Sequence, residues 1–322
     1  MKKFLLKMIT VCTVTAIAVT TALFFAGCSE FSDNPNGPND SNNPNNPGGN
    51  SVNIEIEMVQ IPGGSFQMGD TKNEGYNDEK PVHTVTLTGF YMGKYEVTQA
   101  QYQAVMGRNP SYFDGGSYRE PASGEVQGNR PVESVSWYDA IVFCNKLSMA
   151  KNLSPAYSIS GSTNPADWGS VPNWESNSTW DAVTIVSGST GYRLPTEAQW
   201  EYAAKGGNGS PGNYTYAGSN TVGDVAWYWN NSDNKTHEVG KKAPNGLGLY
   251  DMSGNVWEWC WDWYAEYPSE AQIDPTGAAS GSSRVGRGGY WDDHAGIARS
   301  VFRYIYDPNY WDYGVGFRLV RP

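Results

Sequence analysis

Hydrophobic and polar positions alternate in several short stretches of the chain, as expected for β-strands with one buried face. Residues 54–59 alternate and predict a strand. After the turn at 62–64, residues 66–68 begin a second strand, and residues 82–87 alternate again. Residues 90–96 extend this third strand. The first part of the folded region is therefore predicted to consist of short strands.

Three short helices are predicted from their start signals. Thr98 and Thr196 are each followed three residues later by glutamine, which is the spacing of a capping box. Ser136 begins the other helix, and Gly107 ends the first. The residues expected to face inward are Tyr102, Val105, Met106, Trp137, Ile141, Cys144, Leu147, Trp200, Ala203 and Ala204. Short helices among strands and long loops predict one α+β domain over residues 52–322.

The first residues have the pattern of an export signal. A basic start is followed by an apolar stretch at 8–25 and by small residues before Cys28. The pattern resembles a bacterial lipoprotein signal, residues 1–27, cleaved before a lipid-bearing Cys28. An N-terminal anchor helix is the alternative, because the apolar stretch is close to membrane-spanning length. Lipidation implies a protein of the bacterial cell envelope, held on the outer membrane through Cys28 and exposed at the surface.

Residues 28–51 are rich in Asn, Pro, Gly and Ser and contain almost nothing apolar. This composition predicts a disordered linker that holds a domain away from a membrane. The formal net charge is -11, and this acidic balance argues against nucleic acid as a partner, because phosphate binding needs a basic surface. Cys144 and Cys260 either form a disulfide in an exported protein or remain buried free thiols.

The C-terminal run 287–318 keeps neither a helical nor a strand period for long, and it is crowded with Tyr, Trp, Asp and Gly. Its composition is similar to that of an antibody paratope, in which rigid aromatic side chains supply contact area at low entropic cost. We therefore expect a ligand-binding surface. The alternative is an irregular, aromatic-rich segment of the core.

Motifs along the whole domain resemble the formylglycine-generating-enzyme, or sulfatase-modifying-factor, family. They lie at 61–69, 79–83, 95–98, 130–137, 192–203, 245–259, 287–289 and 316–318, in the order that the family shows. The resemblance implies a variant of the C-type lectin fold, with small twisted β-sheets, short helices and long irregular loops.

The resemblance also implies chemistry that part of this sequence lacks. The enzymes of the family oxidise a substrate cysteine with a pair of copper-binding cysteines between the Arg-Gly-Gly and Gly-Phe-Arg motifs. Residues 290–315 contain no cysteine, so we expect neither that oxidase activity nor a catalytic cofactor. The family's structural calcium implies ligands at Asp251, Gly254, Val256 and Glu258. Alternatively, Asp251 caps a turn and Glu258 pairs with a base.

Within the family, the C-terminal run resembles the variable region of proteins diversified by retroelements, which randomise adenines in Asn codons. Arg287, Trp291, Arg299, Arg303 and Pro308 match fixed positions. The resemblance implies a variable ligand-binding face made of Tyr290, Asp292, Asp293, His294, Gly296, Ile297, Phe302, Tyr304, Ile305, Tyr306, Asp307, Asn309, Tyr310, Trp311, Asp312, Tyr313, Gly314 and Val315. Arg299, Arg303 and Trp291 are expected to support this face through buried packing and hydrogen bonds.

Two functions remain open at this point. One is a surface-displayed, receptor- or adhesin-like protein that binds a protein or glycan through the variable face. The other is a sulfatase-modifying-type oxidoreductase that acts on a cysteine of a substrate protein. Sugar binding through a lectin-type calcium site is a third interpretation, but the sequence lacks a Glu-Pro-Asn motif of that kind.

Overall fold

The computed structural model describes residues 54–209 and 213–322. Residues Val52–Pro322 form one compact unit. The expected signal peptide (1–27), the lipid-bearing Cys28 and the linker (28–51) lie outside the described residues. Within the described part, no helix is long and apolar enough to cross a membrane.

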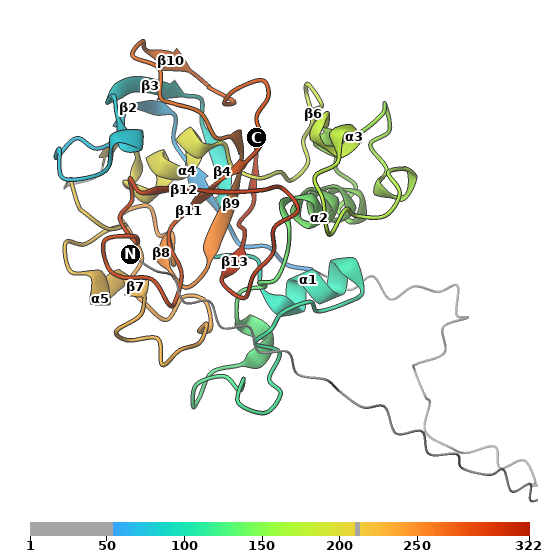
Figure 1. Cartoon of the computed structure of the whole chain (residues 1–322), viewed down its shortest axis with the longest axis horizontal. Coiled ribbons are helices and arrows are strands. Elements are labelled where there is room, and N and C mark those ends of the chain that lie inside the picture. The colour runs from blue at the N-terminus through green and yellow to red at the C-terminus, as the bar shows by residue number, and fades with distance from the viewer. Residues whose placement is uncertain (1–53, 210–212) are drawn as a thin grey trace, which may run out of the picture. The chain divides into compact units, whose positions relative to one another are not determined.

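Small sheets and short helices make up the domain, which confirms the predicted α+β class (Figure 1). A three-stranded sheet has the order β1-β4-β14, and a second has the order β10-β3-β2. A four-stranded sheet has the order β12-β11-β9-β13, and the pairs β5-β6 and β7-β8 complete the set. The strands are β1 Met58–Ile61, β2 Gly64–Met68, β3 His83–Leu87, β4 Phe90–Gly93, β5 Tyr157–Ser158, β6 Thr184–Ile185, β7 Ala226–Trp227, β8 Ser253–Gly254, β9 Trp257–Trp263, β10 Gln272–Ile273, β11 Arg284–Arg287, β12 Arg303–Tyr306, β13 Val315–Gly316 and β14 Val320–Arg321.

The first predicted strand is shorter than expected. Residues 54–57 alternate as a strand would, but β1 begins only at Met58. Its antiparallel partner β4 ends at Gly93, which pairs with Met58, and beyond this pair a single backbone hydrogen bond follows, from Lys94 N to the carbonyl of Glu57. Residues 90–96 do not extend the strand at 82–87 as predicted: they contain a separate strand, β4, which ends at Gly93 and belongs to a different sheet from β3.

The three predicted helices begin where their caps indicated. Helices α1 (Gln99–Met106), α2 (Trp137–Ala150) and α4 (Glu197–Ala204) each have a complete capping box, at Thr98, Ser136 and Thr196. Gly107 ends α1 in the left-handed conformation, with φ of 77°. Single turns that the sequence did not predict are α3 (Ser178–Asp181), α5 (Val222–Val225) and the 3-10 turns η1 Asn77–Glu79, η2 Gln127–Asn129, η3 Pro165–Asp167 and η4 Gly207–Gly209.

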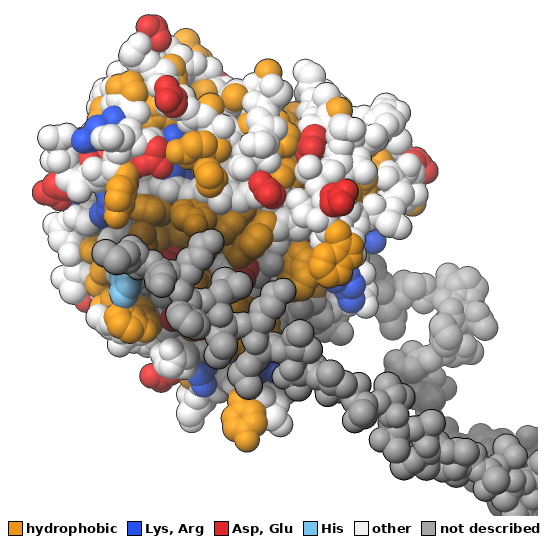
Figure 2. All heavy atoms as spheres, viewed as in Figure 1, with side chains coloured by type: hydrophobic (Ala, Val, Ile, Leu, Met, Phe, Trp, Pro, Cys, Tyr) orange, Lys and Arg blue, Asp and Glu red, His pale blue; other side chains and the backbone are white. Residues whose placement is uncertain are grey.

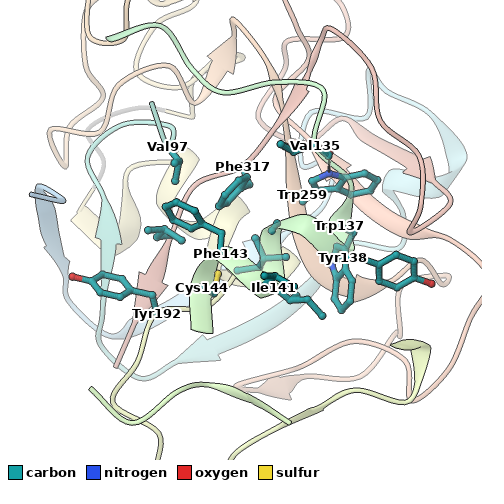
Figure 3. Close-up of a cluster of buried hydrophobic side chains, with 14 of the residues drawn as sticks. Val97, Val135, Trp137, Tyr138, Ile141, Phe143, Cys144, Tyr192, Trp259 and Phe317 are labelled. Atoms are coloured by element: carbon teal, nitrogen blue, oxygen red, sulfur yellow. Dashed lines mark hydrogen bonds between the residues drawn. The ribbon is translucent and has the colours of Figure 1, made fainter. Parts of the chain in front are cut away.

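Helix α2 supplies the centre of one hydrophobic core. Its residues Ile141, Phe143 and Cys144 pack toward Phe317 and Trp259 from the C-terminal half (Figure 3). A second core lies between α4 and strands β1–β4 and contains Cys260. Because the two cysteines lie in different clusters, both are buried free thiols and they do not form a disulfide.

Candidate functional site

The C-terminal run enters and leaves the four-stranded sheet. Strand β11 ends at Arg287, β12 returns beside it at the edge of the sheet, and β13 pairs in parallel with β9 (Figure 1). Loops join these strands, so both ends of the run are fixed by backbone pairing.

Buried arginines hold this run to the rest of the domain. Arg303 is 3% exposed, and its Nε and Nη2 donate to the two carboxylate oxygens of Glu197 at 2.6 and 2.7 Å. Its Nη1 donates to the carbonyls of Asp78 and Ala265. Such a fork fixes the orientation of the guanidinium as well as its position. The expected supporting role of Arg303 therefore agrees with the structure.

Three more Arg–Glu pairs join the run to the domain; Arg299 and Arg318 each donate to both carboxylate oxygens of their glutamate, whereas Arg287 donates to one oxygen of Glu201. Each pair joins an arginine of the C-terminal run to a buried glutamate of an earlier family motif. The pairs are Arg287–Glu201 at 2.5 Å, Arg299–Glu79 at 2.6 Å and Arg318–Glu258 at 2.6 Å. We call the four Arg–Glu pairs, including Arg303–Glu197, the ionic frame. Trp291 is also buried, as expected, and packs edge-on against Phe113.

Above the ionic frame, the run exposes large apolar side chains. Tyr304, Ile305, Tyr310, Trp311 and Tyr313 are between 37% and 50% exposed. Figure 2 shows hydrophobic side chains gathered in a band across the face over which β12 runs. Single exposed hydrophobics are ordinary, whereas a contiguous group is typical of an interaction surface.

The other predicted face residues divide by burial. His294, Gly296 and Asp307 are exposed, and those that are half-buried are Tyr290, Asp292, Asp293, Ile297, Tyr306, Asn309 and Asp312. Phe302, Gly314 and Val315 are buried, which corrects their placement on the exposed face. Phe302 and Val315 pack in the α2 core. At Gly314, a Cβ would lie 2.0 Å from the Tyr290 ring.

The run also encloses a pocket of about 260 Å³. The predicted face residues that line it are Tyr290, Asp293, Ile297, Tyr304, Tyr306, Tyr310, Asp312, Tyr313, Gly314 and Val315. Trp257 of β9 completes the wall and was not predicted as a site residue. It belongs to the Asn-Val-Trp-Glu-Trp motif, whose pattern does not indicate which side of the strand the ring occupies.

Exposed aromatic residues from other loops surround the face, and the sequence analysis missed them. Tyr76, Tyr112, Trp174 and Trp229 are each at least half exposed. Three of them contact the run directly, because Tyr76 meets Phe302, Tyr112 meets Tyr313 and Trp229 meets His294. Trp174 and Trp311 line one cavity of about 450 Å³. The apolar surface is therefore wider than the variable run.

The residues expected to hold calcium are buried but differ in what they offer an ion. Glu258 accepts two hydrogen bonds from Arg318, at 2.6 Å each, and one from the Trp200 indole at 2.7 Å. It is thus paired with a base, as the alternative interpretation held. Asp251 accepts from Gly240 N through Oδ2, whereas its Oδ1 is buried without a hydrogen-bond partner. The four positions fit calcium only in part, through Asp251.

The backbone at Gly254 is tightly enclosed. Two buried acids, Asp251 and Glu96, belong to the same part of the structure. Gly254 has φ of 77°, and a Cβ there would lie 2.1 Å from the carbonyl oxygen of Trp227. Burial raises the pKa of Asp251 to about 6, and burial raises the pKa of Glu96 well above its usual range. No group of three or more His, Cys, Asp or Glu in the described part of the chain is arranged to hold a metal ion.

Comparison with known proteins identifies the relatives of this domain. The sulfatase-modifying factor enzyme 1-like domain matches residues 44–322. The chain is 40% identical over 288 residues to the chaperone protein LppX of Paenibacillus barcinonensis, covering 84% of this chain and 91% of that protein. It is 31% identical over 295 residues to the formylglycine-generating enzyme of Streptomyces coelicolor, covering 81% and 88%. The solved structure of Treponema denticola variable protein 1 matches with a TM-score of 0.75 and 44% identity, covering 82% of this chain and 95% of that one.

The ionic frame leads to a prediction about stability. Replacing Arg303 by Met leaves Glu197 buried without its main partner, and we expect a loss of about 3–5 kcal/mol in the free energy of unfolding. The control Arg108→Met removes a pair in which the arginine side chain is 56% exposed, and should cost about 1 kcal/mol or less. Urea unfolding measures both values. Equal losses in the two variants would show that the Arg303 pair has no special role.

Proposed function

The chain belongs to the sulfatase-modifying factor enzyme 1-like family, and within it we propose a surface-displayed binding protein whose C-terminal face is diversified by a retroelement and captures a protein or glycan ligand. One observation carries the proposal. Five large apolar side chains of a single run stay exposed while the residues beside them are fixed by buried Arg–Glu pairs. The likeness to a variable protein, at 44% identity, supports the same function.

The run contains both exposed residues and residues fixed in the core, and this division fits the proposed function. Ligand-binding residues need to change without unfolding the domain, so they must make few contacts with the core. Tyr304, Trp311 and Tyr313 meet this condition, since each is at least 40% exposed. Large aromatic side chains are also the residues that contribute most energy at protein interfaces.

The envelope location is part of the proposal. Its support is the sequence pattern alone: the basic and apolar start, Cys28 and the polar linker at 28–51. A lipid on Cys28 would hold the domain at the membrane while the linker gives it reach. Display on the outer membrane would bring the aromatic face to partners outside the cell.

The competing function is oxidation of a substrate cysteine, since one relative is a formylglycine-generating enzyme. That chemistry needs a reactive thiolate. Cys144 and Cys260 are both fully buried, and burial raises the pKa of each thiol. Neither thiol is available to an outside substrate, so we propose binding without catalysis.

Calcium bound at Asp251 remains a proposal. It is supported by the buried Oδ1 without a hydrogen-bond partner and by the nearby acids Glu96 and Glu258, which share the one guanidinium of Arg318. Oxygen ligands of this type suit calcium. An ion there would neutralise part of the buried negative charge.

Asp251→Asn tests the calcium proposal. The pKa of Asp251 is raised on folding, so its contribution to stability is greatest below pH 4 and falls as pH rises through about 6. In chelator at pH 8, the variant should therefore be more stable than the wild type, by up to about 3 kcal/mol. Added calcium should raise the melting temperature of the wild type and leave the variant unchanged. If calcium does not change the melting temperature of the wild type, the calcium proposal is wrong, while the predicted pH dependence of stability is unaffected.

Retroelement diversification predicts a signature in the DNA around the gene. A near-copy of the codons for 287–318 should lie close by, next to a reverse transcriptase gene. The two copies should differ mainly where the template has adenine. Sequencing the locus checks this, and a locus with no second copy would contradict diversification by this route.

The binding face can be tested without knowing the natural ligand. A displayed library randomised at Tyr304, Ile305, Tyr310, Trp311 and Tyr313 should stay folded and yield binders to a purified probe protein such as lysozyme. A matched library at the buried residues Trp257, Trp259, Phe302, Val315 and Phe317 should lose the folded fraction, because core packing tolerates few changes. Resistance to protease on the cell surface measures folding. Equal tolerance in both libraries would refute the assignment of the face.

A further inference from the structure

The pocket in the C-terminal run has an unusual combination of walls. Six aromatic side chains line it, together with two acids, and no Lys, Arg or His is among the described residues around it. The aromatic residues are Trp257, Tyr290, Tyr304, Tyr306, Tyr310 and Tyr313, and the acids are Asp293 and Asp312. We call this the aromatic–acidic pocket. A ring face attracts cations, and so does a carboxylate.

The rings support one another in a fixed arrangement. Tyr306 and Tyr310 are stacked, with centroids 4.6 Å apart and an interplanar angle of 10°. Tyr304 lies 4.9 Å from Tyr306 and 5.3 Å from Trp257. The pocket wall is therefore built before any ligand arrives, which lowers the entropic cost of binding.

The two carboxylates lack a positive partner. Asp293 accepts a hydrogen bond from Tyr290 N at 3.2 Å, and Asp312 accepts one from the Tyr310 hydroxyl at 3.1 Å. Neither forms a salt bridge with any described residue, unlike the glutamates of the ionic frame. Burial raises the pKa of Asp293 to about 7, with Asp292 adding to the effect. Half-buried carboxylates without a counter-charge are a favourable place for a cation.

We propose that the aromatic–acidic pocket takes one alkylammonium group, the side chain of a lysine on a protein partner. The proposal rests on the proposed function, because it names the chemistry that the binding face recognises. A volume of about 260 Å³ suits a single side chain rather than a complete small molecule. The exposed rings of Tyr304, Tyr310 and Tyr313 stand at the pocket and would cover the partner surface around that lysine.

A choline headgroup carries similar chemistry, but the surrounding surface favours a protein. Tyr76, Tyr112, Trp174, Trp229 and Trp311 extend the apolar area well beyond the pocket. A lone headgroup would leave these side chains in water, whereas a protein surface would bury them around a central anchor. A lysine in the pocket with apolar contacts around it uses the whole face.

Small probes separate charge recognition from simple hydrophobic binding. On the whole domain, n-butylammonium stands for the lysine side chain, and 1-butanol is its uncharged counterpart. Saturation-transfer NMR titrations should show n-butylammonium binding at least ten-fold more tightly. At pH 8, where Asp293 is mostly ionised, Asp293→Asn keeps the shape of the side chain and should weaken that binding at least ten-fold without lowering the melting temperature. The control Asp233→Asn changes an exposed acid that does not line the pocket and should have no effect.

Each remaining outcome decides the proposal. Equal binding of the two probes, or equal losses in the two Asn variants, would overturn it. A different outcome is that the wild type co-sediments with phosphatidylcholine vesicles and that Asp293→Asn abolishes this co-sedimentation. That result would show that the pocket binds a lipid headgroup, and it would overturn the proposal of a lysine on a protein partner. If the randomised face yields binders while n-butylammonium fails, the pocket proposal falls and the proposed function stands. If n-butylammonium binds and the library yields no binders, the pocket's preference for a cation stands and the proposed function falls.

Discussion

The structure depends on the buried ion pairs that connect its last segment to the rest of the domain. Arg303 and Glu197 illustrate the constraint, because neither partner can be removed without leaving a charge in a nonpolar interior. A buried pair gives less net stability than its short distances suggest, since both groups lose their hydration. Its main effect is geometric: the forked contacts allow one position of the backbone. On the proposed function, this is what allows the exposed residues between the arginines to differ in chemistry while the path of the chain is kept.

The sequence predicted most of what depends on local signals. The capping residues Thr98, Ser136 and Thr196 located three helices, because the cap hydrogen bonds are made within one turn. Exposure of Tyr304 and burial of Arg303 followed from the matched motif. Burial of Phe302 did not, since it lies on an irregular loop without a period to indicate its direction. Trp257 and the flanking Tyr76 were also not predicted as site residues, because only the tertiary fold brings them to the face.

Acids on the two sides of the C-terminal run have opposite environments. Beneath it, Glu197 and Glu201 each meet arginine. On its outer side, Asp293 and Asp312 line a pocket with no positive side chain among the described residues. A carboxylate paired with arginine thus holds the run in place, whereas a carboxylate without a positive partner can attract a cationic group of a ligand. The ionic frame lies apart from the exposed side chains of the run, so a scaffold shared with a formylglycine-generating enzyme can present a different surface.

The contact between Tyr290 and Gly314 limits how freely the face can vary. With the tyrosine ring in place, even a methyl group at 314 would overlap it. A bulkier residue at one of these positions therefore requires a smaller or redirected one at the other. We therefore expect the residues at 290 and 314 to vary together, so that the number of workable faces is smaller than the product of the choices at each site. Among siblings of this chain, large side chains at 290 and 314 should rarely occur together.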